Sequence, residues 1–254
     1  MNENRREYDD VAPAYYARPV FVRNTRAREW WTLAHPPYTL CHLSFVVVGA
    51  CLEKPVSASR LLDTLVAFFL AVGVSAHALD ELHGRPLRTT IPTWQLVAAA
   101  VIGLVGSCAL GVYGMTHVSW SLAYFILVGV VLAIGYNLEI AHGLLHNDVV
   151  FALGWGAFPL LTGFFAQHVS LNPEALLASL YAAFIALAQR RLSTPARMLR
   201  RTTNEVEGSI TMHDGRRTIL TRAQLLAPLE RALSYLCWAS VLLASALALA
   251  RFRG

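Results

Sequence analysis

Residues 89–138, TTIPTWQLVAAAVIGLVGSCALGVYGMTHVSWSLAYFILVGVVLAIGYNL, run for 50 positions without a single Asp, Glu, Lys or Arg. A soluble domain of this size needs charged residues throughout its surface, so this stretch is typical of a chain that lies in lipid. The whole composition agrees, since 56% of the 254 residues are hydrophobic and only 15% are charged, against about 25% charged in ordinary soluble domains. The sequence therefore argues against a soluble globular protein and predicts an integral membrane protein.

Seven apolar segments are long enough, or nearly long enough, to cross a bilayer. A spanning helix needs about 20 mainly apolar residues, because the hydrocarbon core is about 30 Å thick and each residue rises about 1.5 Å. The first and sixth segments are short, and we expect them to extend into their flanks. The predicted fold class is an all-α, polytopic transmembrane helical bundle of about seven spans over residues 38–254. The segments are Tyr38–Leu52, Leu62–Leu79, Trp94–Gly114, Ser119–Leu138, Val149–His168, Ala175–Gln189 and Ala232–Ala250.

Small residues and a proline interrupt the fifth segment. Gly154 and Gly156 lie on either side of a tryptophan, and Pro159 follows three residues after the second glycine. Small residues let neighbouring helices approach closely, and a proline inside a span kinks the helix where neighbouring protein can compensate for the lost hydrogen bond. We predict close packing and a distortion at this point.

The basic residues set the predicted orientation. The chain has 21 basic residues, 20 of them arginine, and a net charge of +5. With seven spans and a cytoplasmic N-terminus, 17 of the 21 basic residues lie on the cytoplasmic side, as the positive-inside rule requires. Residues 1–37 then form a cytoplasmic N-terminal arm without a secretory signal, and residues 190–231 form a basic cytoplasmic segment. We therefore expect a multi-pass protein of the cell (inner) membrane and no nucleic-acid partner.

Ionisable residues gather where the second apolar segment ends. His77, Asp80 and Glu81 are spaced i, i+3 and i+4, so a helix that continues through Glu81 places them on one face. Ionisable groups at this depth are costly and usually face an interior or a wet cavity. The alternative is a polar cap at the end of the helix.

A second polar run follows the fourth apolar segment. Glu139, His142 and His146 are spaced i, i+3 and i+7, which gives one face if the helix runs that far. Glu-x-x-His on an inward face is a spacing that carboxylate-bridged metal sites use in helical bundles. Two interpretations remain open here, a bound transition metal and a solvated loop.

A third polar run follows the sixth segment. Five arginines, among them Arg190 and Arg191, lie between positions 190 and 201. The arginine fork matches phosphate oxygens, so this cluster fits either a diphosphate ligand or the anionic headgroups of membrane lipid.

Four stretches of the chain, in order, resemble the UbiA superfamily of intramembrane prenyltransferases. They are the entry segment 29–40 (EWWTLAHPPYTL), the run 79–87 (LDELHGRPL) at the place of the family's Asn-Asp-x-x-Asp motif, Tyr136, and the run 152–159 (ALGWGAFP). The resemblance covers residues 30–191. Three features depart from the family pattern. Gln189 and two arginines stand near the place of the second Asp-rich motif, Ile140 stands where a basic residue usually follows the tyrosine, and seven spans replace the common nine.

The resemblance implies a cytoplasm-facing cavity that binds an isoprenyl diphosphate with Mg²⁺ and transfers the isoprenyl group to a lipophilic acceptor. The implied catalytic residues are Asp80, Glu81 and Tyr136. The expected substrate-binding residues are Arg85, Asn137, Arg190 and Arg191.

Three hypotheses of function follow. The first is the prenyltransferase-type enzyme. The second is an enzyme with a transition-metal centre on the same scaffold, with the ligands His77, Asp80, His83, Glu139, His142 and His146. The third is a non-catalytic bundle that binds an isoprenoid or a quinone, or that serves as a subunit of a membrane complex. The mechanistic hypotheses share one structural expectation, which is that the ends of the second, fourth and sixth segments converge on a common pocket with Asp80 at its rim.

Overall fold

The computed structural model describes residues 24–253. Residues 1–23 of the predicted N-terminal arm lie outside this part, and the rest of the arm contains helix α2 (Thr25–Leu33) and the start of the next helix. The described chain is almost entirely helical, with one short antiparallel hairpin.

The elements follow one another with short connections. The first half contains α3 (Pro36–Ala50), α4 (Ala58–Phe68), the π-helical segment η1 (Phe69–Ala76), α5 (His77–Leu82), α6 (Thr93–His117) and α7 (Leu122–Asn137). The second half contains α8 (Ile140–Gly143), α9 (Asp148–Ala152), the π-helical segment η2 (Leu153–Ala157), α10 (Phe158–His168), α11 (Pro173–Arg201), β1 (Ser209–Thr211), β2 (Arg217–Ile219) and α12 (Arg222–Phe252).

Within residues 24–253, five continuous helices are long and apolar enough to cross a membrane. They are Ala58–Leu82, Thr93–His117, Asp148–His168, Pro173–Arg201 and Arg222–Phe252. A shorter apolar helix, α7, and the 15-residue helix α3 cover the other two predicted segments. The chain is therefore a multi-pass, almost entirely helical membrane protein. The sixth predicted segment extends into its flanks as expected, whereas α3 does not lengthen.

Side-chain caps fix where several helices begin. Ser57, Asn147 and Asn172 each accept a hydrogen bond from a backbone N–H in the first turn of α4, α9 and α11. Thr221 forms a capping box with Gln224 at the start of α12. These caps satisfy N–H groups that have no partner inside the helix, so each helix starts at a defined residue.

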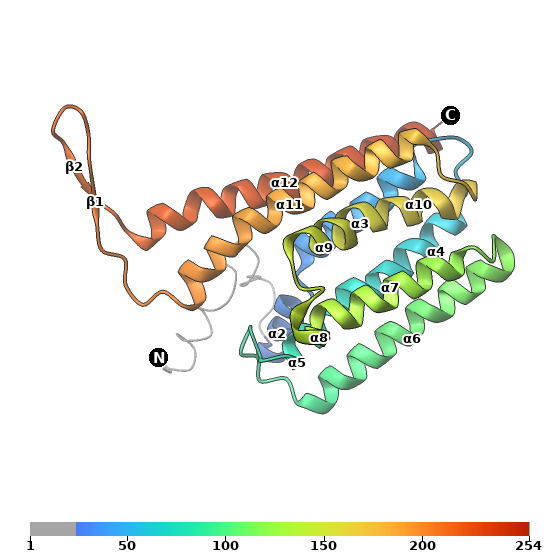
Figure 1. The fold of residues 1–254 in the computed structure, drawn as a ribbon, viewed down its shortest axis with the longest axis horizontal. Helices are drawn as coiled ribbons and strands as arrows, with labels where there is room; N and C mark the ends of the chain where they lie inside the picture. Colours follow the sequence, from blue (N-terminus) through green and yellow to red (C-terminus); the bar gives the residue numbers. More distant parts are fainter. Residues whose placement is uncertain (1–23, 254) are drawn as a thin grey trace.

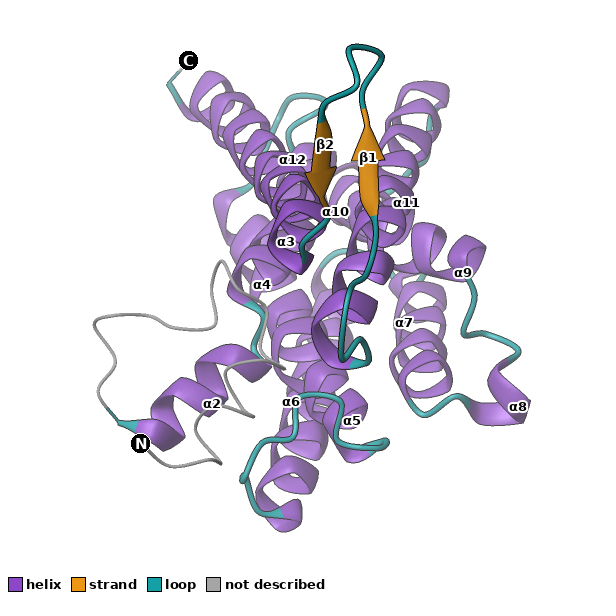
Figure 2. Cartoon of the chain, turned by 90° about the vertical axis from the view of Figure 1, so that its left-hand side faces the viewer, coloured by secondary structure: helices purple, strands orange, loops and turns teal. Residues whose placement is uncertain are grey.

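Helix α3 lies in the middle of one group of helices, between α10 and α12, and α11 packs along α12. Helices α4, α6 and α7 form a second group beside it (Figure 1). The short helices α2, α5, α8 and α9 all lie at one end of the bundle, and the β1–β2 hairpin extends beyond α11 and α12 (Figure 1). We call this the polar end. Figure 2 views the molecule from this end.

Glycines permit the closest helix contacts in the first group. A Cβ atom on Gly163 of α10 would overlap the carbonyl oxygen of Val46 in α3, and one on Gly156 of η2 would overlap that of Ala182 in α11. The prediction of close approach and distortion in the fifth segment is confirmed, because Gly156 makes such a contact inside a π-helical turn that precedes Pro159.

We expect Gly163→Ala to destabilise the protein by about 1–3 kcal/mol, because the added methyl group forces two packed backbones apart. The matched control is Gly129→Ala in α7, where the nearest atom to the new Cβ is a ring carbon of Phe158 at 3.5 Å, an ordinary contact. The control should be neutral or slightly stabilising, since alanine favours the helix. Thermal unfolding in detergent measures both variants, and equal midpoints for the two would contradict this packing.

Candidate functional site

A polar cavity of about 150 Å³ lies at the polar end of the bundle. Side chains from α3, α5, α7, η2, α11 and α12 line this cavity, which we call the polar pocket. Its charged residues are Asp80, Arg190, Arg197, Arg200, Arg201 and Glu230, and its histidines are His35, His42, His77 and His146. The pocket therefore combines a strongly basic wall with a few carboxylates.

The ends of the second, fourth and sixth predicted segments do converge here. Asp80 of α5, Tyr136 of α7 and Arg190 of α11 all line the polar pocket. Asn137 lines it as well, and its buried amide donates a hydrogen bond to the carbonyl oxygen of Ala133 at 2.7 Å. Three helix ends that are far apart in sequence thus form one site.

The carboxylate of Asp80 lines this pocket without a partner in the described part of the chain. Among residues 24–253 it forms no hydrogen bond and no ion pair. The cations that act on it electrostatically are chiefly Arg201 and Arg197, across the pocket on α11. An unpaired carboxylate on the wall of a wet cavity is available to a cation or a proton.

Arg190 is held in place by two partners. Its Nη1 donates to the hydroxyl oxygen of Tyr136 at 2.6 Å, and its Nε donates to Asp148 at 2.9 Å. Arg191 lies outside the pocket lining, pairs with the other oxygen of Asp148 at 3.0 Å and is 73% exposed. Of the three predicted substrate-binding arginines, Arg85, Arg190 and Arg191, only Arg190 lines the pocket.

Aromatic rings form the deep wall of the polar pocket. The ring of Tyr136 lies 4.3 Å from that of Trp155 between centroids, and Trp155 stacks on Phe151 at 5.6 Å. The Arg190 guanidinium lies 5.1 Å from the Phe151 ring centroid, within cation–π range. These faces can stabilise positive charge on an apolar ligand atom.

His35, His42 and His77, of which His42 is buried, also line the polar pocket. The rings of His35 and His77 are 4.7 Å apart, and the Nδ1 atom of His42 shares a hydrogen bond with the carbonyl oxygen of Trp155 at 2.7 Å. Burial lowers the pKa of His35 well below its ordinary value, and the nearby His77, Arg201 and Arg197 lower it further. His35 is therefore neutral at pH 7 and adds polarity to the pocket without adding charge.

Glu81 and Arg85 occupy different positions from those predicted. The fully buried carboxylate of Glu81 accepts hydrogen bonds from the backbone N–H of Leu87 at 3.0 Å and of Thr89 at 2.9 Å. Arg85 donates to the carbonyl oxygen of Ile91 at 2.7 Å. Neither side chain lines the pocket. Both instead hold the loop between α5 and α6, because its backbone groups need partners.

Three of the predicted metal ligands, His77, Asp80 and His146, line the polar pocket, whereas Glu139 and His142 lie in the segment after α7. Helix α7 ends at Asn137, and Glu139 and His142 adopt left-handed backbone angles, so the helical face expected through His146 does not form. Glu139 lies 3.9 Å from His83 and 3.6 Å from His146, while His142 is exposed. In the described part of the chain, no group of three or more His, Cys, Asp or Glu residues could hold a metal ion.

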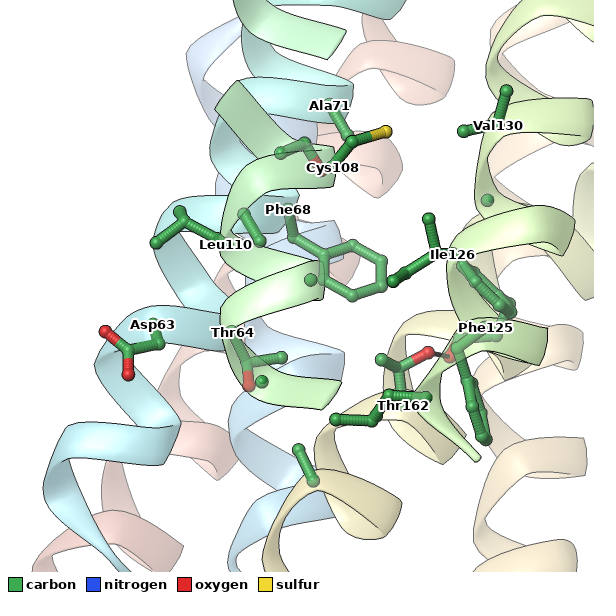
Figure 3. Close-up of a pocket in the computed structure, with 18 of the residues that line it drawn as sticks. Asp63, Thr64, Phe68, Ala71, Cys108, Leu110, Phe125, Ile126, Val130 and Thr162 are labelled. Atoms are coloured by element: carbon green, nitrogen blue, oxygen red, sulfur yellow. Dashed lines mark hydrogen bonds between the residues drawn. The ribbon is translucent and has the colours of Figure 1, made fainter. Parts of the chain in front are cut away.

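An apolar cavity of about 270 Å³ lies between α4, η1, α6, α7 and α10. Figure 3 shows Phe68, Cys108, Ile126 and Phe125 on its walls. Ala76 and Trp155 line both this apolar cavity and the polar pocket, so the two spaces adjoin. A space with charged walls and a space with apolar walls therefore lie next to each other.

Several pocket residues are not among those predicted from the sequence. His42 lies in an apolar run of the sequence. Because burying a histidine without a hydrogen-bond partner is costly, its position there was a signal that it has a polar neighbour. Arg197 and Arg201 belong to the arginine cluster that fits a diphosphate or lipid headgroups, but they are not among the residues predicted individually to bind substrate. Arg197 and Arg201 lie seven and eleven residues after Arg190 on the same helix. This spacing would have indicated that the three arginines share one face of the helix.

No protein-family model, curated protein or solved structure matches this chain.

Proposed function

We propose that the protein is an integral membrane enzyme that transfers an isoprenyl group from an isoprenyl diphosphate to a lipophilic acceptor. The observation that carries this proposal is the junction of two cavities of opposite chemistry at Ala76 and Trp155. An isoprenyl diphosphate has the same two halves, a highly charged head and an apolar tail. A free anion would need only the polar pocket, and a hydrocarbon would need only the apolar cavity.

The basic wall supplies contacts for the diphosphate head. Arg197 and Arg201 lie on the same face of α11, and both line the polar pocket. Arg200 also lines it, but its Nε donates to Glu230 at 2.7 Å. A guanidinium group can donate two parallel hydrogen bonds to the oxygens of one phosphate group, so we propose that the diphosphate head lies against this wall.

Asp80 fits one Mg²⁺ ion shared with the ligand. Magnesium is usually bound by one or two carboxylates together with substrate phosphates and water, and Asp80 is the unpaired carboxylate in the pocket. A second Mg²⁺ ion, which the resemblance implies, does not fit. The Glu81 carboxylate accepts hydrogen bonds from backbone N–H groups, and the Glu230 carboxylate pairs with Arg200. When bound, the ion would neutralise charge on the departing diphosphate.

In the proposed reaction the bond between C1 and the diphosphate oxygen breaks, and its electron pair leaves with the diphosphate. C1 then bonds to the nucleophilic atom of the acceptor, whose proton passes to the released diphosphate. The protein contributes Arg197 and Arg201 for the leaving group and the rings of Tyr136, Phe151 and Trp155 for the positive charge at C1. Arg190 keeps the Tyr136 ring in place through its hydroxyl group.

The experiment that tests this proposal measures release of ³²P-labelled diphosphate from geranylgeranyl diphosphate by the purified protein in nanodiscs. A lipid extract of the host membrane supplies the acceptor, and Mg²⁺ is present or removed by chelation. We expect release that depends on protein, extract and Mg²⁺. Saturable binding without release would favour the non-catalytic binding protein, and the absence of both would contradict the proposal.

We also propose that α3 and α7 cross the membrane with the five longer helices, and that the polar end faces the cytoplasm. The positive-inside rule supports this orientation, because the basic residues of α11 and of the segment before α12 lie at the polar end.

Cysteine labelling tests the orientation. Thr211→Cys in the exposed hairpin should react with a membrane-impermeant maleimide only in inside-out vesicles, whereas Ser170→Cys, between α10 and α11, should react only in intact cells. The reverse pattern would invert the proposed topology.

A further inference from the structure

Asp148, the first residue of α9, contacts two arginines of α11. Its Oδ1 atom accepts a hydrogen bond from Nε of Arg190 at 2.9 Å, and its Oδ2 atom lies 3.0 Å from Nη2 of Arg191. The side chain of Arg190 is only 14% exposed, whereas that of Arg191 is 73% exposed. Because water and salt screen an exposed ion pair more than a partly buried one, the contact with Arg190 is the stronger of the two.

Arg190 connects Asp148 to the deep wall of the polar pocket. Its Nη1 atom donates to the hydroxyl oxygen of Tyr136 at 2.6 Å, and its guanidinium carbon lies 5.1 Å from the centroid of the Phe151 ring. Asp148 itself does not line the pocket. Any effect of Asp148 on a ligand in the pocket therefore passes through the position of the Arg190 side chain.

The Arg190 side chain can also bind an anion, because it lines the pocket and carries a guanidinium group. A phosphate group accepts the same pair of hydrogen bonds from a guanidinium group that a carboxylate does. If Arg190 lost its carboxylate partner, it could turn to a phosphate in the pocket and leave the Tyr136 hydroxyl group. The diphosphate head would then gain a contact, and the aromatic ring near C1 would lose the hydrogen bond that holds it.

We propose that Asp148 is a positioning residue that keeps Arg190 on Tyr136 and away from the diphosphate head. This inference rests on the proposed function, since it divides the arginines of α11 between two tasks in that reaction. Arg197 and Arg201 contact the head, and Arg190 orients the ring. The limit on head contacts also lets the diphosphate product leave, because each additional strong contact lowers the dissociation rate.

Equilibrium binding of inorganic diphosphate tests this inference, measured by isothermal titration calorimetry on the full chain in nanodiscs at constant Mg²⁺. We expect Asp148→Asn to bind this anion about tenfold more tightly than the wild type, as one added hydrogen bond between charged groups allows. The same variant should release diphosphate more slowly from saturating geranylgeranyl diphosphate. Asp148→Glu, which keeps the carboxylate, should return both values toward those of the wild type. Damage to the fold would weaken binding, so opposite changes in affinity and turnover identify a positioning role.

A double variant tests whether the gain in affinity passes through Arg190. When Asp148→Asn is combined with Arg190→Gln, the affinity for inorganic diphosphate should equal that of Arg190→Gln alone. The reason is that the Asp148 side chain is 34% exposed, so solvent screens its own charge. Asp214→Asn is the matched control, because Asp214 also pairs with an arginine but lies in the exposed hairpin, and it should leave the affinity unchanged.

Unchanged or weaker binding by Asp148→Asn would overturn the inference, and so would an equal gain in the presence and absence of Arg190. If either result accompanied normal binding and release of diphosphate by the wild type, only the role of Asp148 would be lost and the proposed function would stand. A wild type that does not bind inorganic diphosphate would contradict both.

Discussion

Replacing Asp80 with asparagine is expected to lower diphosphate release from geranylgeranyl diphosphate by about 100-fold or more, as the loss of a preorganised charged group at a reacting centre commonly does. The substitution keeps the size of the side chain and removes only its charge. The carboxylate of Asp80 forms no hydrogen bond or ion pair with the described residues, so the substitution breaks no such contact.

The same assay separates binding from chemistry. With Asp80→Asn we expect kcat to fall far more than the affinity for the isoprenyl diphosphate, because the arginines of α11 remain to hold the head. The dependence on Mg²⁺ should weaken as well. Asp214→Asn, in the hairpin and outside both cavities, is the control and should retain wild-type release. Unchanged release by Asp80→Asn would remove this carboxylate from the mechanism.

The second large effect is expected from filling the apolar cavity. Ala71 in η1 lines this cavity, where Figure 3 places it near Cys108. It lies five residues before Ala76, the junction with the polar pocket, which corresponds to about 7 Å along the helix. Ala71→Phe therefore blocks the space that a long tail would occupy and leaves the junction itself open.

We expect Ala71→Phe to weaken binding of geranylgeranyl diphosphate by about 100-fold, since burial of each lost methylene contributes about 0.8 kcal/mol. Binding of dimethylallyl diphosphate, whose tail ends near the junction, should change little. Leu127→Phe on α7 adds a similar ring at a side chain that is 63% exposed and lines neither cavity, and it should affect neither ligand. Competition with a radiolabelled isoprenyl diphosphate measures all three proteins. An equal loss of both ligands in Ala71→Phe would place the tail elsewhere.

The helices could be predicted from the sequence because lipid leaves the backbone few alternatives. In a bilayer every N–H and C=O group must be satisfied within the protein, so an apolar run of spanning length becomes a helix. The end of α7 could not be predicted in the same way. Glu139 carries a helix-compatible side chain, yet its left-handed backbone angle follows the end of α7 and leads the chain into α8. Such turns depend on tertiary contacts that a single sequence does not reveal.

The candidate site was predictable where it depends on helix ends and not where it depends on loops. His77 and Asp80 share a face at i, i+3 and both line the polar pocket, as their spacing indicates. Glu81 is turned by about 100° from Asp80 around the helix, and the N–H groups of Leu87 and Thr89 occupy its carboxylate. The path of that loop decides the role of Glu81, and the sequence alone did not give this path.

The most direct measurement is an experimental structure of the protein with geranylgeranyl thiodiphosphate, an analogue that reacts slowly, and Mg²⁺. We predict that the diphosphate head lies against Arg197 and Asp80 and that the tail passes between Ala76 and Trp155 into the apolar cavity. A head bound outside the polar pocket, or a tail that leaves the apolar cavity empty, would contradict the assignment of the two cavities to one ligand.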